Sequence, residues 1–216
     1  MRHGRDSCLS QRQATYEIRS EDPLSLHEAP PIMSAVAANA YRFLTRWRVP
    51  ADIKEVADIL DDANSLPRWW PSVYLSVREI QPGDRNGVGR VIDLHTKGWL
   101  PYTLRWRFRI TESRYPDGFS LVASGDFNGT GVWTMTQAGP FVEATYDWQI
   151  RADKPLLRYL SPIFKPIFAA NHRWAMRKGE ESLKLELARR RAATSEERDR
   201  VPRPPGPTFT RSRAAN

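Results

Sequence analysis

The stretch Tyr102-Thr-Leu-Arg-Trp-Arg-Phe-Arg-Ile110 decides how the middle of this chain folds. Its aromatic and aliphatic residues occupy every second position, and a threonine and three arginines fill the positions between them. Successive side chains of a β-strand point to opposite faces of a sheet. The alternation therefore predicts a strand with one buried, aromatic face and one solvated, basic face.

Six further segments of similar pattern surround this strand. Turn clusters rich in glycine, proline, aspartate and asparagine separate most of them, as is typical of successive strands in one sheet. The segments predicted to be strands are 41–49, 73–81, 89–96, 102–113, 119–124, 127–136 and 141–151. We therefore expect one curved antiparallel sheet of seven strands.

Helical patterns interrupt the strands at two places. After the first strand, Asp52 is followed three residues later by Glu55, and apolar residues then recur at helical spacing, which predicts a capped short helix. A second short helix is expected next, with Pro67 in its first turn. After residue 155 the period is again helical, and an apolar stripe over residues 163–187 predicts a long C-terminal helix.

The order of these elements is similar to the helix-grip fold of the SRPBCC superfamily, which includes START-like lipid binders and polyketide cyclase/dehydrase-like proteins. The local features that carry the resemblance are Val49-Pro-Ala-Asp52, Trp69-Trp-Pro-Ser-Val73, Gly87-Val-Gly89, Gly179 and Leu183. The resemblance implies an α+β fold in which the sheet grips the long helix and a cavity lies between them. It also implies that Trp70 closes one end of the cavity and that Gly179 lets the helix approach the sheet.

We predict one ligand-binding domain over residues 41–190. Residues 1–40 read as a disordered leader, and residues 191–216 as a disordered tail rich in arginine and proline, because neither end has enough apolar surface to offset the entropy of ordering. The net charge is +8, and residues 189–216 alone hold eight arginines against three acidic residues. More than half of the basic excess therefore belongs to residues 189–216.

Missing residues exclude several classes of function. There are four histidines, two of them near the N-terminus, and no pair has metal-ligand spacing. The chain has no nucleophile elbow, phosphate-binding loop or dinucleotide fingerprint, so we expect no metal and no cofactor. It has neither a signal-peptide run nor an apolar stretch of about 18 residues, and it contains only one cysteine. Together these features predict a cytoplasmic protein.

The inward faces of the predicted strands and helix are unusually aromatic. The residues predicted to line the cavity are Phe43, Trp47, Trp70, Ile92, Leu94, Trp106, Phe108, Leu121, Trp133, Met135, Tyr146, Trp148, Phe164, Phe168, His172 and Met176. Such a lining suits a lipid, a sterol or a flat polyketide-like molecule. The alternative is that these side chains pack on one another and leave little void.

Few polar residues are candidates for chemistry. His172 lies on the apolar face of the long helix and titrates near neutral pH, so it is the best candidate for an acid or base, with Asn171 and Tyr146 beside it. The alternative is that His172 is simply a partly exposed residue at one end of the cavity. Asp93 and His95 share one strand face, and the apolar character of the other face predicts that they point outward.

Two functions are compatible with this pattern. The first is binding or transport of a small hydrophobic ligand between the sheet and the long helix. The second is a cyclase or dehydratase-like enzyme that uses polar cavity residues as acid and base. For the basic tail we expect solvation, with weak contact to a membrane surface as the alternative, and we expect no specific nucleic-acid partner.

Overall fold

The computed structural model describes residues 40–152 and 155–209, without the side chains of residues 152–164. One antiparallel sheet has the strand order β1-β7-β6-β5-β4-β3-β2, so each strand pairs with its neighbour in sequence except that β1 pairs with β7. The strands are β1 (Ala40–Val49), β2 (Tyr74–Gln81), β3 (Val91–Lys97), β4 (Thr103–Ser113), β5 (Gly118–Gly125), β6 (Phe127–Ala138) and β7 (Phe141–Ala152). All seven predicted strands are confirmed.

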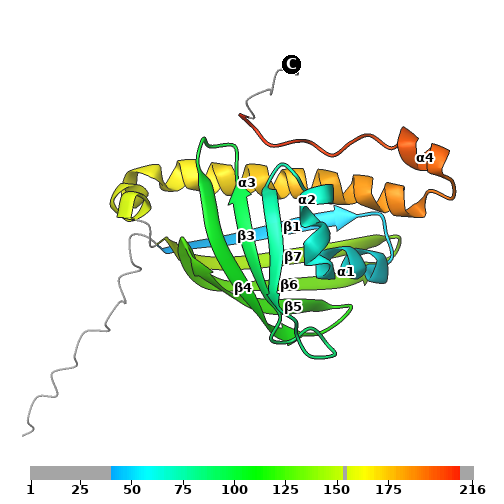
Figure 1. Ribbon diagram of the computed structural model, residues 1–216, viewed down its shortest axis with the longest axis horizontal. Helices are drawn as coiled ribbons and strands as arrows, with labels where there is room; N and C mark the ends of the chain where they lie inside the picture. The colour runs from blue at the N-terminus through cyan, green and yellow to red at the C-terminus, as the bar shows by residue number, and fades with distance from the viewer. Residues whose placement is uncertain (1–39, 153–154, 210–216) are drawn as a thin grey trace, which may run out of the picture. The chain divides into compact units, whose positions relative to one another are not determined.

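The long helix α3 (Pro155–Arg191) lies across the curved sheet (Figure 1). Between β1 and β2 the chain forms α1 (Ile53–Asp61), a 3-10 turn at Ala63–Ser65 and α2 (Leu66–Trp69). The α+β fold is thus a helix-grip fold, as the sequence predicts. No helix among residues 40–152 and 155–209 is both long and apolar enough to cross a bilayer.

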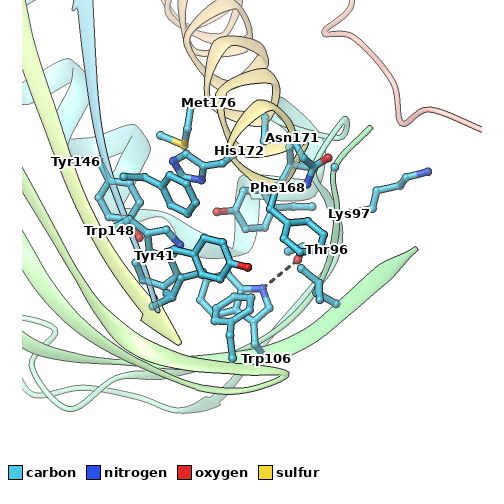
Figure 2. Close-up of a pocket in the computed structure, with 18 of the residues that line it drawn as sticks. Tyr41, Thr96, Lys97, Trp106, Tyr146, Trp148, Phe168, Asn171, His172 and Met176 are labelled. Atoms are coloured by element: carbon cyan, nitrogen blue, oxygen red, sulfur yellow. Dashed lines mark hydrogen bonds between the residues drawn. The ribbon is translucent and has the colours of Figure 1, made fainter. Parts of the chain in front are cut away.

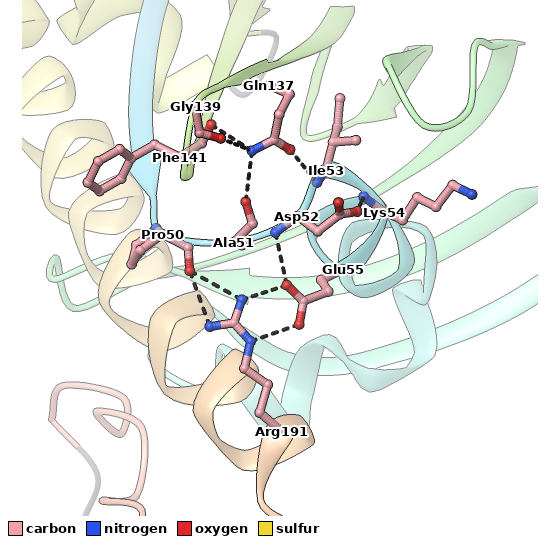
Figure 3. Close-up of polar contacts among 10 residues, drawn as sticks. All are labelled: Pro50, Ala51, Asp52, Ile53, Lys54, Glu55, Gln137, Gly139, Phe141 and Arg191. Carbon is pink, nitrogen blue, oxygen red and sulfur yellow. Dashed lines mark hydrogen bonds and ion pairs between the residues drawn. The ribbon is translucent and has the colours of Figure 1, made fainter.

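The predicted cap of α1 also joins the far end of α3. The Asp52 carboxylate accepts a hydrogen bond from the backbone N–H of Lys54, and the Glu55 carboxylate accepts one from the N–H of Asp52. Arg191 of α3 donates to both Glu55 carboxylate oxygens, at 2.7 and 2.5 Å, and to the carbonyl of Pro50 (Figure 3). One glutamate therefore caps α1 and anchors the last turn of α3.

The two faces of the sheet differ as the alternation predicts. In β4, Phe108 and Ile110 are buried, whereas Arg105, Arg107 and Arg109 are exposed. The buried face packs against α1, α2 and the C-terminal half of α3, where Leu183 and Leu187 are nearly inaccessible, and together they form one core. This core holds the C-terminal half of α3 against the sheet.

The chain after α3 differs from the predicted disorder as far as residue 209. Helix α4 (Ser195–Arg200) begins with a capping box, in which Thr194 and Glu197 satisfy one another's backbone N–H groups. Arg189 donates to the carbonyls of Val201 and Pro202. Composition did not reveal these contacts, because each depends on a specific polar partner and not on apolar burial. The predicted leader, apart from Ala40, and residues 210–216 lie outside the described residues.

Candidate ligand-binding site

A cavity of about 170 Å³ lies between the inner face of the sheet and α3. It is nearest the end of the sheet where β1 begins and β7 ends. Figure 2 shows aromatic side chains from the sheet and from α3 converging on it. Its lining residues are Tyr41, Phe43, Trp70, Val73, Tyr74, Thr96, Lys97, Gly98, Tyr102, Leu104, Trp106, Phe127, Tyr146, Trp148, Ile150, Phe168, Asn171, His172, Ala175 and Met176.

Eight residues from the predicted lining lie at this cavity. They are Phe43, Trp70, Trp106, Tyr146, Trp148, Phe168, His172 and Met176. Three others, Phe108, Leu121 and Trp133, line a smaller inner cavity of about 70 Å³. Trp70, Tyr74, Trp106, Tyr146 and Met176 line both cavities and separate the two spaces.

The remaining predicted lining residues lie elsewhere. Trp47, Ile92, Leu94 and Met135 are buried and line neither cavity, because this part of the inner face is covered by closely packed side chains. The Trp47 ring, for example, lies 5.6 Å from that of Trp70 and 5.0 Å from that of Trp133. Phe164 belongs to α3, but its side chain lies outside the described residues.

Several lining residues were not selected from the sequence. Tyr41 lies on the same strand face as Phe43, Thr96 on that of Leu94, and Ile150 on that of Trp148, so the alternation contained a signal for each. Ala175 belongs to the predicted apolar stripe of the long helix, whereas Tyr74, Lys97 and Gly98 were missed for another reason. Their positions at the cavity depend on where α3 and the β3–β4 connection cross the sheet, which periodicity does not give.

His172 is held as a neutral imidazole. Its ring stacks on Phe43 with centroids 4.3 Å apart, and its Nε2 lies 3.4 Å from the Thr45 hydroxyl. Burial lowers the pKa of His172 to about 4, and the charge of Arg173 acts in the same direction. At neutral pH the ring is therefore uncharged and offers a nitrogen lone pair for a hydrogen bond or a proton.

Asn171 holds the loop that joins β3 and β4. Its Oδ1 accepts hydrogen bonds from the backbone N–H groups of Trp99, at 2.9 Å, and Leu100, at 3.3 Å. A Cβ atom on Gly98 would lie 2.1 Å from the same oxygen, so the loop and the helix are in close contact. Since the carbonyl oxygen is already engaged, Asn171 positions the rim of the cavity.

Three of the cavity tyrosines, Tyr74, Tyr102 and Tyr146, are neutral phenols. Tyr146 stacks on Trp133 with centroids 4.5 Å apart and on Trp148 at 5.5 Å. Burial raises the pKa of both Tyr146 and Tyr74, and it raises the pKa of Tyr102 to about 12. Each hydroxyl can therefore donate and accept a hydrogen bond, but none supplies a negative charge at neutral pH.

The Thr96 hydroxyl is a further polar group in the cavity wall, and it is bonded to Trp106. The indole N–H of Trp106 donates to the Thr96 hydroxyl at 3.0 Å (Figure 2). This contact orients the Trp106 ring as part of the cavity wall and occupies an acceptor site of the threonine. Together with the neutral histidine and phenols, it gives a mostly apolar cavity with a few uncharged hydrogen-bonding groups, the usual composition of a small-molecule site. Lys97 also lines the cavity, but its side chain points away (Figure 2) and its ammonium group donates to the Thr208 carbonyl.

Asp93 and His95 point away from the cavity, as predicted. The Asp93 carboxylate pairs with Arg107 at 3.1 Å and Arg78 at 3.5 Å on the outer face of the sheet. Partial burial lowers the pKa of His95, and nearby Arg105 contributes. These residues therefore form no acid–base pair in the cavity.

The described chain resembles solved structures of two named kinds. The Zhui aromatase/cyclase from Streptomyces sp. R1128 matches at a TM-score of 0.57 and 17% identity, over 71% of this chain and 97% of that one. A START superfamily protein from Mycobacterium smegmatis matches at 0.52 and 12% identity, over 66% and 98%. The chain shares the fold of these structures. A third structure, the di-domain ARO/CYC BexL from the BE-7585A biosynthetic pathway, matches at 0.52 and 17% identity, over 68% of this chain and 50% of that one.

These similarities concern the fold alone, because the identities are low and one fold serves many functions. No protein-family model matches the sequence, and no curated protein matches it. An assignment of function within this helix-grip fold therefore depends on the cavity itself.

Proposed function

We propose that this protein binds a small, ring-containing apolar molecule in the cavity beneath α3. The observation that carries the proposal is the cavity wall, which combines stacked aromatic rings with neutral hydrogen-bonding groups. Flat rings of a ligand stack favourably on Trp, Tyr and Phe side chains. A few uncharged polar groups then orient ring hydroxyl or keto oxygens without the cost of burying an ion.

The cavity volume limits the size of the ligand. An apolar cavity of roughly 150 Å³ accepts benzene, so about 170 Å³ suits one or two fused rings. A larger molecule would fit only if this space joined the inner cavity. Met176 lines both cavities and has the most flexible of the side chains between them, so a change in its rotamer is the simplest way to connect the two. A sterol is larger than the cavity in its present form, so we favour a compact aromatic ligand.

An enzymatic role is the second candidate, and one observation favours it. Burial holds His172 neutral in contact with the cavity, as a general base requires. Its pKa of about 4 makes it a weak base, and its neighbour is a hydroxyl, not a carboxylate that would strengthen it. Binding is therefore the simpler proposal, and a cyclase-like reaction of the bound ring compound is the alternative.

The test is a titration of the full-length protein with 2-naphthol, followed by tryptophan fluorescence. Ala175→Phe and Leu104→Phe place a ring inside the cavity, and each should weaken binding at least tenfold. Val122→Phe, on the exposed outer face of β5, is the matched control and should leave binding unchanged. Equal affinity for the parent protein and all three variants, each shown by circular dichroism to be folded, would disprove the proposed site.

Mass spectrometry of the protein under native conditions, followed by extraction, would identify a ligand that remains bound. If a substrate is found, His172→Gln separates the two functions. Loss of turnover with affinity retained would support the enzyme, whereas a bound compound that is recovered unchanged would support the carrier.

A further inference from the structure

The part of the C-terminal tail that the structure describes after α4, residues 201–209, runs back along α3 to the rim of the cavity. Figure 1 shows it leaving α4 and running back beside the long helix. At its start, Arg189 of α3 donates to the carbonyls of Val201, at 3.3 Å, and Pro202, at 3.0 Å. At its end, the Thr208 hydroxyl shares its one proton between the carbonyls of Gly98, at 3.2 Å, and Trp99, at 3.3 Å. The tail is thus fixed at both ends.

The tail has the composition and the length of a stiff connector. Within Val201-Pro-Arg-Pro-Pro-Gly-Pro-Thr208, four prolines fix the backbone dihedral φ and lower the entropy lost on ordering. At the polyproline rise of about 3.1 Å per residue, these residues extend roughly 22 Å. Helix α3 rises about 27 Å between Asn171 and Arg189. The two lengths agree well enough for the tail to join the end of α3 to the loop held by Asn171.

The loop that receives the tail forms part of the cavity rim. This rim loop, residues 98–102, joins β3 to β4, and both Gly98 and Tyr102 line the cavity. Asn171 binds its backbone N–H groups from the side of α3, while Thr208 binds its carbonyls from the side of the tail. The rim loop is therefore held by two independent sets of hydrogen bonds, which we call clasps. Asn171 holds its N–H groups and Thr208 holds its carbonyls.

Lys97, the last residue of β3, strengthens the second clasp. Its ammonium group donates to the Thr208 carbonyl and lies 5.5 Å from the centroid of the Phe209 ring. Lys97 also lines the cavity, so the residue that holds the tail is in the cavity wall itself. The Phe209 ring is otherwise 74% exposed, so its packing on the core contributes little to holding the tail.

We propose that the tail is a strap that holds the rim loop against α3 and thereby controls how fast a ligand enters and leaves. The proposal rests on the proposed function for its consequence, but not for its structural content. When Thr208 releases Gly98 and Trp99, the rim loop keeps only the Asn171 clasp and opens more often. Ligand exchange is then faster, while the equilibrium affinity changes little, because entry and exit use the same opening.

Two measurements on the full-length protein test the strap. Amide hydrogen exchange over the rim loop reports its opening whether or not a ligand binds. Stopped-flow fluorescence with 2-naphthol reports entry and exit rates. The informative variant is Thr208→Val, which removes the hydroxyl donor at nearly constant shape, and Thr208→Ser is its matched control because it keeps the donor. A chain that ends after Pro204 removes the whole clasp together with two arginines, Arg211 and Arg213, so the double variant Arg211→Gln/Arg213→Gln controls for the lost charge.

We expect amide exchange at Trp99 and Leu100 to rise about three- to tenfold in Thr208→Val, and further in the shortened chain. The 2-naphthol rates should rise by similar factors, and Thr208→Ser and the Arg211→Gln/Arg213→Gln variant should match the parent protein. Unchanged exchange in both Thr208→Val and the shortened chain would overturn the strap. Failure of 2-naphthol to bind any form would instead contradict the proposed function, and the exchange data would still decide on the strap.

Discussion

Gly179 of α3 packs directly on the indole of Trp70. A Cβ atom added to Gly179 would lie 2.3 Å from Cζ2 of Trp70, well inside contact distance. The ring has little freedom to move, because its centroid lies 5.5 Å from that of Trp69 and 5.2 Å from that of Tyr74. The glycine therefore sets the separation between α3 and the wall of both cavities.

Gly179→Ala should destabilise the protein by up to about 2 kcal/mol. Alanine favours the helix by about 1 kcal/mol over glycine, but overlap with a confined ring costs about 1–3 kcal/mol or more. Urea denaturation of the two proteins measures the difference. In a Trp70→Phe background the overlap is relieved, so the same substitution should cost much less. A more stable Gly179→Ala protein would show that the ring moves aside freely.

The strands were predictable because the sheet has one buried and one exposed face. Arg105, Trp106, Arg107 and Phe108 alternate so regularly that both the strand and its orientation follow from the sequence. The cap of α1 consists of residues close together in the chain and is local as well. The cap of α4 is equally local, but a composition rich in arginine and proline predicted disorder there instead. These features depend on neighbours in the chain, and no knowledge of tertiary packing is needed to recognise those neighbours.

The position of the void was not predictable in the same way. Tyr41 and Trp47 share the inward face of β1, yet only Tyr41 lines the cavity, because Trp70 and Trp133 pack against Trp47. Alternation identifies which side chains point inward. Whether an inward side chain meets another residue or empty space depends on where α1, α2 and α3 cover the sheet, and that is settled only in three dimensions.

Removal of the Asn171 acceptor should loosen the rim loop. In Asn171→Leu the N–H groups of Trp99 and Leu100 lose their partner, which should cost about 1–3 kcal/mol and raise their amide exchange. Asn171→Asp keeps an acceptor oxygen at the same place and is the matched control. We expect it to retain most of the protection. Equal exchange in the two variants would mean that the side-chain oxygen does not hold the loop.

His172 should make the protein less stable as the pH falls from 6.5 to 4. The unfolded chain takes up a proton near pH 6.5, whereas the folded protein does so only near pH 4. Between these values the unfolded state binds more protons, so stability decreases as pH is lowered, by about 3 kcal/mol at most. Urea denaturation at several pH values gives the slope.

His172→Gln should remove much of that slope. His95→Gln is the matched control, because His95 lies on the outer face of the sheet and is less enclosed. We expect it to leave most of the pH dependence in place. A slope unchanged by His172→Gln would show that the imidazole takes up its proton in the folded state as readily as in the unfolded chain.

The pair between Glu55 and Arg191 should matter at neutral pH and be lost in acid. Hydrogen bonds from Arg191 lower the pKa of Glu55 to about 2, from an unfolded value of 4.5. The contribution to stability is therefore complete above pH 4.5 and disappears as the pH falls towards 2. Because both side chains are more than a third exposed, solvent screens the pair. We expect Arg191→Gln to cost about 1 kcal/mol at pH 7 and much less near pH 2.

The matched control is Arg200→Gln, which removes a highly exposed pair with Glu196 within α4. That pair joins neighbouring turns of one short helix, so its loss should change the free energy of unfolding by less than about 0.5 kcal/mol. Urea denaturation at pH 7, 4 and 2.5 compares the two variants with the parent protein. Because Arg191 joins the end of α3 to the cap of α1, only its loss should also raise amide exchange at residues 52–55. If both variants behaved alike, the contact between α3 and α1 would have no stabilising role beyond that of an ordinary surface pair.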